Sequence, residues 1–126
     1  MAKFSLLKPP RRFQPTQLSN VKINEVARIE LATDEQVCLV TSMGSEYDIL
    51  RKEWGYYATP SINKRLSENG FDVYLVKNSL NHFFLMLVMM CKYMMFVQYC
   101  EKEGLTIVIK LDENTFNDYE KITRNT

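Results

Sequence analysis

The sequence predicts a small α+β domain, and three observations support that fold class. The chain has 126 residues, which is the usual size of a single domain. Hydrophobic residues make up 46% of it and charged residues 25%, as in ordinary globular proteins. Short runs of strand-forming residues alternate with two segments of helical character. We therefore expect one α+β domain over residues 21–126, preceded by an extended arm over residues 1–20.

The arm is rich in proline and in basic residues. Pro9, Pro10 and Pro15 disfavour a helix or a central strand. Its charged residues are Lys3, Lys8, Arg11 and Arg12. We expect an extended segment that either lies on a partner subunit or frays.

The next segment has the character of a β-hairpin followed by a third strand. Residues 26–31 and 36–42 are rich in strand-forming residues, and residues 32–35 have the composition of a turn. Residues 47–52 alternate in a way that is compatible with another strand. We expect the first two runs to pair with each other.

A first helix is predicted to begin at Thr59 and Pro60. Threonine is a favoured N-cap residue, and proline suits the first helical position because its missing N–H would be unpaired there. Ile62 and Leu66 lie four residues apart and form the expected buried stripe. The helix is expected to stop at Gly70.

The remaining sequence predicts a hairpin, a helix and a last strand. Residues 71–77 and 82–89 are strand-like and flank a turn at residues 78–81. From Lys92 the apolar residues follow a helical period until Gly104, which supplies the stop. These apolar residues are Tyr93, Phe96, Val97 and Cys100. A strand at 105–111 and a short C-terminal helix at 112–122 complete the chain.

From residue 46 onward the predicted order is β-α-β-β-α-β, which is the ferredoxin-like order. An extra N-terminal hairpin and a short C-terminal helix would be added to it. This arrangement places both helices on one face of a mostly antiparallel sheet. The other face would need cover from a second subunit, the N-terminal hairpin or a ligand.

Charge and composition argue against several classes of partner. The formal net charge is +1, so no global field attracts nucleic acid or an anionic membrane. The strand at residues 82–88 lacks the glycine and the basic residues of RNA-recognition modules. Lys92 interrupts the apolar stretch at residues 83–100, so we expect no membrane span and a cytoplasmic protein.

The cysteines and the single histidine argue against a metal site and a cofactor. Cys38, Cys91 and Cys100 have no ligand spacing, and their odd number does not suit a disulfide framework. We expect reduced and buried thiols. His82 is the single imidazole available as a general base, and we expect it to be structural or solvent-facing.

One stretch combines cations, aromatic rings and a predicted helix start. The candidate ligand-binding residues are Arg51, Trp54, Tyr56, Tyr57, Thr59, Ser61 and Arg65. A helix N-terminus attracts phosphate or carboxylate, and the two arginines could clamp such an anion. The rings could stack on a sugar or base, while the hydroxyls of Thr59 and Ser61 orient oxygens. The alternative is that the rings are core anchors and that Thr59 only starts a helix.

The methionines suggest a second feature. Met90, Met94 and Met95 lie around Lys92 and cannot all face inward on one amphipathic helix. We therefore expect a homo-oligomer interface there, in a dimer, with a thick core as the alternative.

The run from Trp54 to Asn63, with Arg65-Leu66 and Val76-Lys77-Asn78, resembles a set of small uncharacterised bacterial proteins associated with surface-polysaccharide gene clusters. The resemblance covers residues 46–112, and the methionine-rich helix departs from the more charged helix of that set. It implies no known activity, and it favours phosphorylated sugars or nucleotide sugars as ligands.

We therefore expect a non-enzymatic ligand-binding or accessory module for an anionic small molecule. One alternative is a small enzyme that uses Tyr56 or Tyr57 as acid or base on a sugar or nucleotide. The other is a structural module that binds a protein partner.

Overall fold

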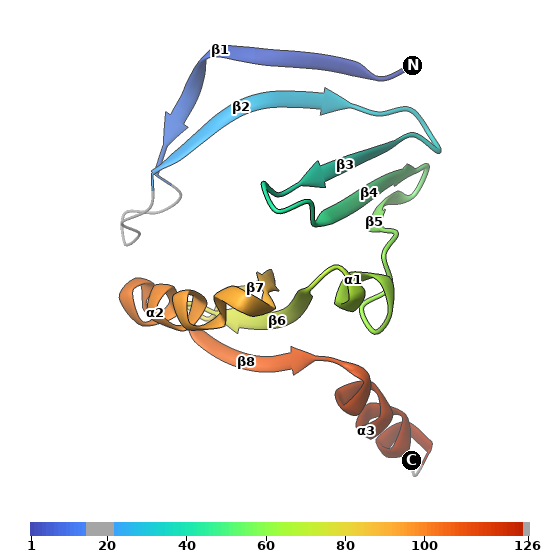
Figure 1. The fold of residues 1–126 in the computed structure, drawn as a ribbon, viewed down its shortest axis with the longest axis vertical. Helices are drawn as coiled ribbons and strands as arrows, with labels where there is room; N and C mark the ends of the chain where they lie inside the picture. The colour runs from blue at the N-terminus through green and yellow to red at the C-terminus, as the bar shows by residue number, and fades with distance from the viewer. Residues whose placement is uncertain (15–21, 125–126) are drawn as a thin grey trace. The chain divides into compact units, whose positions relative to one another are not determined.

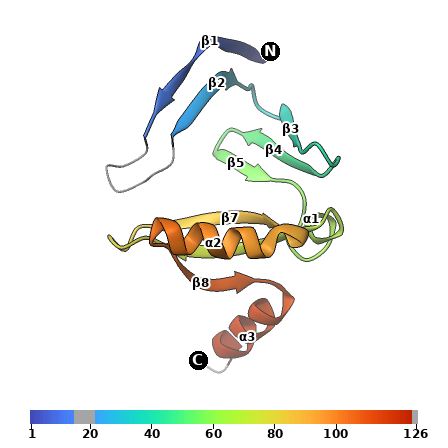
Figure 2. The ribbon, with the colours of Figure 1, turned by 60° about the vertical axis from the view of Figure 1, so that its left-hand side comes forward.

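A computed structural model describes residues 1–14 and 22–124 of the chain. It divides the chain into two compact units, an N-terminal unit over Met1–Thr59 and a C-terminal unit over Pro60–Thr126. The structure is of the α+β class, and Figures 1 and 2 show its elements from two sides. No helix in the described ranges is long and apolar enough to cross a membrane.

The described residues of the N-terminal unit form two antiparallel sheets. Strands β1 (Lys3–Phe13) and β2 (Ile23–Glu30) form a two-stranded sheet. Strands β3 (Gln36–Val40), β4 (Glu46–Lys52) and β5 (Gly55–Ala58) form a three-stranded sheet in that order.

The expected arm is extended over its described part, but it is a paired strand. Its register with β2 shifts between Leu6 and Arg11, so the segment that contains Pro9 and Pro10 falls outside the regular ladder. Proline has no N–H to give to a ladder, and the irregularity is where it is tolerated. Residues 15–20 of the expected arm lie outside the described residues.

The predicted hairpin between residues 26–31 and 36–42 is wrong, because β2 pairs with β1 and β3 pairs with β4. The turn after β3 explains the second pairing. The Gly44 backbone has a φ of 88°, and the Ser45 N–H donates to Thr41 Oγ1 at 3.1 Å. This turn returns the chain directly alongside β3, which favours the sequential neighbour as its partner. Strand β5 was not predicted.

Up to Arg124, where the described part of the chain ends, the C-terminal unit contains one sheet and three α-helices. Its strands are β6 (Phe71–Lys77), β7 (Phe83–Met89) and β8 (Thr106–Leu111), in the order β7-β6-β8 with antiparallel pairing throughout. Its helices are α1 (Arg65–Glu68), α2 (Tyr93–Glu103) and α3 (Glu113–Arg124), and a short 3-10 helix, η1 (Met90–Lys92), precedes α2. The predicted hairpin, the second helix with its stop at Gly104 and the last strand are confirmed.

The ferredoxin-like order is not confirmed. The segment predicted as its first strand is β4, which lies in the sheet of the N-terminal unit between β3 and β5. The sheet of the C-terminal unit therefore has three strands among the described residues, with β6 at its centre. The extra strands before residue 46 do not form the expected hairpin either.

The core of the C-terminal unit lies between the sheet and α2, which runs along the sheet in both views (Figures 1 and 2). Tyr74, Val76 and Val88 are buried there, and Phe96 of α2 packs against them. The Tyr74 and Phe96 ring centroids are 5.3 Å apart. Because side chains alternate along a strand, Leu75 between Tyr74 and Val76 points to the opposite face of the sheet.

Part of that opposite face is buried, since Val73, two residues before Leu75, is 2% exposed. The rest of it carries exposed apolar side chains, and we call this part the open face. Leu85 and Ile109 lie directly across from Leu75 on the two neighbouring strands, and Phe83 is two residues from Leu85. Cross-strand partners share a face of the sheet, so these residues lie side by side. Phe83 and Leu85 are each 58% exposed and Ile109 is 40% exposed.

Candidate functional site

The hairpin of β4 and β5 positions Arg51 beside Tyr56. The two residues are direct cross-strand partners, so their side chains share one face of the sheet. The guanidinium carbon of Arg51 lies 5.3 Å from the centre of the Tyr56 ring. Arg51 Nη1 also donates to the Gly55 carbonyl at 3.3 Å, which fixes the cation against the turn. This pair is the part of the predicted ligand site that the structure brings together.

Trp54 and Tyr57 form a separate ring pair. Their ring centroids are 5.8 Å apart with an angle of 14° between the planes. Tyr57 follows Tyr56 directly in β5, so the two tyrosines point to opposite faces. Of these three rings, the Tyr56 ring therefore lies beside Arg51, and the rings of Tyr57 and Trp54 do not share its face.

Thr59, Ser61 and Arg65 do not form the predicted helix start, and that prediction is wrong. The Thr59 N–H donates to the Asp48 carbonyl at 3.2 Å and its hydroxyl donates to Gln36 Oε1 at 3.1 Å, so Thr59 extends the sheet. The Ser61 carbonyl accepts the N–H groups of Lys64 and Leu66 in a turn, and α1 begins only at Arg65. The hydrogen bonds of Thr59 to the sheet therefore outweigh the local preference of Thr59 and Pro60 for a helix start.

The predicted residues also divide between the two units. Arg51, Trp54, Tyr56, Tyr57 and Thr59 belong to the N-terminal unit. Ser61 and Arg65 belong to the C-terminal unit. With α1 only four residues long, the helix dipole that was expected to attract an anion does not arise here.

A hollow of about 360 Å³ lies beside Arg51 and Tyr56 in the N-terminal unit. Its other lining residues are Met1, Glu30, Leu31 and Ala32. Leu31 is the buried member of this set. The hollow offers a cation, a ring and a carboxylate to a bound molecule.

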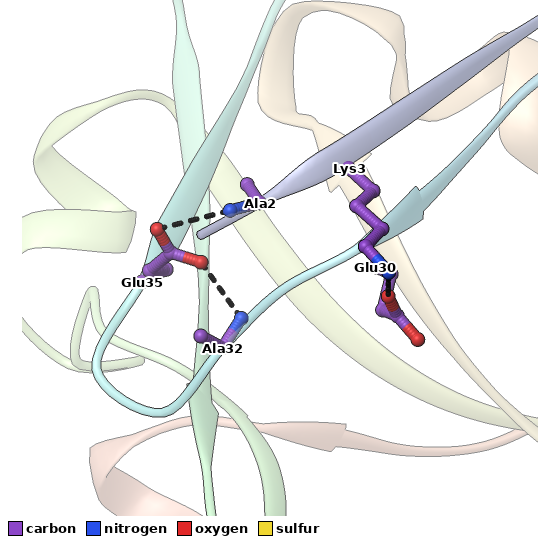
Figure 3. A network of polar contacts seen from close by, with 5 residues as sticks. All are labelled: Ala2, Lys3, Glu30, Ala32 and Glu35. Atoms are coloured by element: carbon purple, nitrogen blue, oxygen red, sulfur yellow. Dashed lines mark hydrogen bonds and ion pairs between the residues drawn. The ribbon is translucent and has the colours of Figure 1, made fainter.

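Polar contacts hold the segment that borders this hollow (Figure 3). Glu35 Oε1 accepts the Ala32 N–H at 2.7 Å, and Oε2 accepts the Ala2 N–H at 3.2 Å. Lys3 and Glu30 form an ion pair at 3.6 Å across the first sheet. Glu35 lies three residues after Ala32, a spacing that suits a local side-chain to backbone bond.

Cys38, Glu46 and Asp48 form a second polar group, with their candidate ligand atoms all within 4.8 Å of one another. Cys38 and Asp48 are direct partners across β3 and β4. A hydrogen bond to Asp48, desolvation and the nearby carboxylates raise the pKa of Cys38 to about 11. A cation would have to displace that thiol proton. Sequence reasoning predicted no metal site, and the register that gathers these residues was not visible in their spacing.

The three cysteines are free, but the prediction that all are buried is wrong. Cys38 and Cys91 are exposed, and Cys100 is buried in α2. Burial raises the pKa of Cys100. The thiolate is the reactive form, so the raised pKa of Cys38 counteracts its exposure.

The C-terminal unit has two further apolar features besides the open face. Met90, Met94 and Met95 are exposed by 42%, 65% and 60%, which confirms that they do not all face inward. A hollow of about 460 Å³ lies along β8 and α3. Its lining residues are Ile109, Leu111, Thr115, Phe116, Tyr119 and Glu120.

Comparisons of the chain with family models, with curated proteins and with solved structures found no match. The resemblance to small bacterial proteins stays a prediction. The functional argument therefore depends on the geometry of the described residues.

Proposed function

We propose that this chain is a non-enzymatic module that binds another protein chain through the open face of its C-terminal unit. The observation that carries the proposal is the exposure of Phe83, Leu85 and Ile109 side by side on one sheet face. A helix covers the opposite face of the same sheet. A sheet normally buries its apolar faces, and here a partner chain would contact the part of the face that this chain leaves exposed.

Burial of the exposed apolar side chains would stabilise a complex. Fully burying a leucine or phenylalanine side chain stabilises by about 1.5–3 kcal/mol. Phe83, Leu85 and Ile109 are about half exposed, so covering them would contribute about 3 kcal/mol in total. Large exposed apolar patches rimmed by polar residues mark interaction sites.

Site-specific photo-crosslinking tests this function. A photoreactive phenylalanine analogue at Phe83 should give a covalent adduct with another polypeptide in living cells, and Leu85→Lys should abolish it. The same analogue at the exposed Lys102, in the same unit, is the matched control and should give none. Absence of an adduct at Phe83, or a crosslink solely within one chain, would overturn the proposal.

The Arg51–Tyr56 pair supports a second function, the binding of an anionic small molecule such as a phosphorylated sugar or nucleotide sugar. A guanidinium binds phosphate or carboxylate, and the ring beside it can stack on a sugar. Surface-polysaccharide metabolism comes only from the sequence resemblance. An enzyme that uses Tyr56 as acid or base would share this site.

Thermal melting against nucleotides, nucleotide sugars and sugar phosphates tests the second function. A ligand at 100 times its dissociation constant adds about 2.7 kcal/mol of stability. We expect Arg51→Met to remove the shift, with Arg28→Met of the first sheet as the control. Turnover that Tyr56→Phe removes would favour the enzyme, and the absence of any shift would refute this candidate.

The free cysteines suit a reducing compartment, and for that reason we propose a cytoplasmic location.

A further inference from the structure

We infer that the partner is a second copy of this chain, joined to the first through an antiparallel pairing of the two β7 strands. The inference rests on the proposed function, since it names the protein that contacts the open face at its β7 edge. It makes the predicted homodimer specific, and it places the contact on a strand rather than on the methionines of α2.

Strand β7 is an edge of the sheet in the C-terminal unit. The order β7-β6-β8 leaves one row of its backbone N–H and C=O groups unpaired by any described strand. Such an edge is a template for another strand unless charge, proline or a bulge prevents pairing. From Phe83 to Met89 the strand contains no charged residue, no proline and no glycine.

The other edge of the same sheet is protected. Strand β8 carries Lys110, and its register with β6 shifts between Leu75 and Val76. A charge and a bulge are two of the devices by which proteins keep edges from pairing. The contrast between the two edges selects β7 as the strand that accepts a neighbour.

The sequence of β7 is suited to meeting itself. In an antiparallel pair centred on Met86, Leu85 of one copy lies across from Leu87 of the other, and Phe83 from Met89. Every such pair is apolar, so a two-fold axis brings no like charges together. The pairing would also join the two open faces at Phe83 and Leu85.

The contact is suited to a weak dimer. Phe83, Phe84, Leu85 and Met90 are between 42% and 58% exposed. Edge pairing would cover only the sides of these side chains that face the second copy, together with the backbone edge, so the contact is smaller than the ~800 Å² per copy of a standard interface.

Light scattering on the full-length protein across a range of concentrations tests the inference. We expect a mass of 14.8 kDa at low concentration and about twice that value at high concentration. Leu85→Lys should keep the protein monomeric, because the charge would enter the paired edges. Val108→Lys is the matched control, since Val108 is an exposed apolar residue of the opposite edge strand, and it should leave the dimer intact.

Hydrogen exchange provides a measurement that needs no variant. Exchange of the β7 amides in the wild-type protein should slow as concentration rises, while exchange in β8 should not change. A wild-type protein that stays monomeric, or β7 exchange that does not depend on concentration, would overturn the inference. Dissociation by Val108→Lys but not by Leu85→Lys would also overturn it.

The crosslinked species separate this inference from the proposed function. An adduct at Phe83 with a different protein, together with a monomeric purified chain, would refute the second copy but keep the protein-binding function. A crosslink from Phe83 to residues of the N-terminal unit of the same chain would refute both.

Discussion

In the C-terminal unit, α2 lies along a three-stranded sheet and buries Tyr74, Val76 and Val88, whereas the described residues of the N-terminal unit bury only Leu31 and Asp48. Both units contain well-paired antiparallel strands. The difference is that helices pack against the sheet of the C-terminal unit. Backbone pairing alone therefore produces regular strands, while a core requires an element that crosses over them.

This comparison bears on function. The N-terminal unit gathers polar groups by register, as at Arg51 and Tyr56 or at Cys38 and Asp48. The C-terminal unit leaves an apolar face and an apolar edge, at Phe83 and Leu85. Local polar groups and an exposed apolar surface thus lie in different parts of one chain.

The largest expected effect is loss of core packing in the C-terminal unit. Leu66→Ala should cost about 2–5 kcal/mol of unfolding free energy, because Leu66 is 2% exposed and its removal leaves a cavity. Leu39→Ala in the N-terminal unit should cost less than about 0.5 kcal/mol, since Leu39 is 54% exposed. Urea denaturation followed by circular dichroism measures both. Equal losses would remove the contrast between the units.

Turn glycines give the next effect and show whether the units open separately. Gly104 ends α2 with a φ of 67°, and Gly44 sits in the β3–β4 turn with a φ of 88°. Alanine at either position should cost about 1–2 kcal/mol, because an L side chain is strained in the left-handed region. Hydrogen exchange should accelerate in α2 and β8 for Gly104→Ala, and in β3 and β4 for Gly44→Ala. Equal acceleration throughout the chain would show one cooperative unit.

The Cys38–Asp48 contact predicts a change in thiol reactivity. The pKa of Cys38 is raised from 9.0 to about 11, so Cys38 is a neutral thiol at pH 8. The contribution of this thiol to the stability of the folded state is complete below pH 9 and is lost as the pH rises toward 11. Asp48→Asn should lower this pKa and increase the thiolate fraction at pH 8. The larger thiolate fraction speeds alkylation, while the weaker nucleophilicity of a thiolate of lower pKa offsets part of that gain. We therefore expect alkylation to become about 10-fold faster.

Mass spectrometry of iodoacetamide-treated protein at pH 8 measures that rate at Cys38. Cys91, also exposed, is the internal control and should react at the same rate in both proteins. An unchanged rate at Cys38 would show that Asp48 does not control the thiol.

The smallest expected effects come from surface ion pairs. Lys110 pairs with Asp72 at 3.5 Å on β8 and β6, and Lys3 pairs with Glu30 at 3.6 Å on β1 and β2. Lys110→Met and Lys3→Met should each change the unfolding free energy by less than about 1 kcal/mol, because solvent screens both pairs. Chemical denaturation at low and high salt measures the difference, and a larger salt-independent loss would show that packing rather than charge is involved.

Several elements were predictable because their signals are local. The strand at residues 71–77, the turn at 78–81 and the helix that stops at Gly104 match the structure closely. In each case the apolar period and the breaker residue agree. The helix predicted at residues 59–69 is limited to α1, because the Thr59 N–H donates to the Asp48 carbonyl of β4.

For the candidate site, sequence reasoning found Arg51 and Tyr56 but not their geometry. It grouped Tyr56 with Tyr57 and Trp54. In the structure Tyr57 points to the opposite face of β5 from Tyr56 and stacks with Trp54. It also missed the contact of Cys38 with Asp48, since the two lie ten positions apart and meet only through the β3–β4 register.

The sequence by itself determined the apolar periods, the glycine stops and the surplus of apolar side chains near Met90. Tertiary structure alone decided that β2 pairs with β1, that β4 leaves the sheet of β6, and that β7 lies at an edge. The physical reason is the separation along the chain over which each interaction acts. Turn and helix preferences act within a few residues, whereas strand partners compete over the whole chain for the same backbone hydrogen bonds.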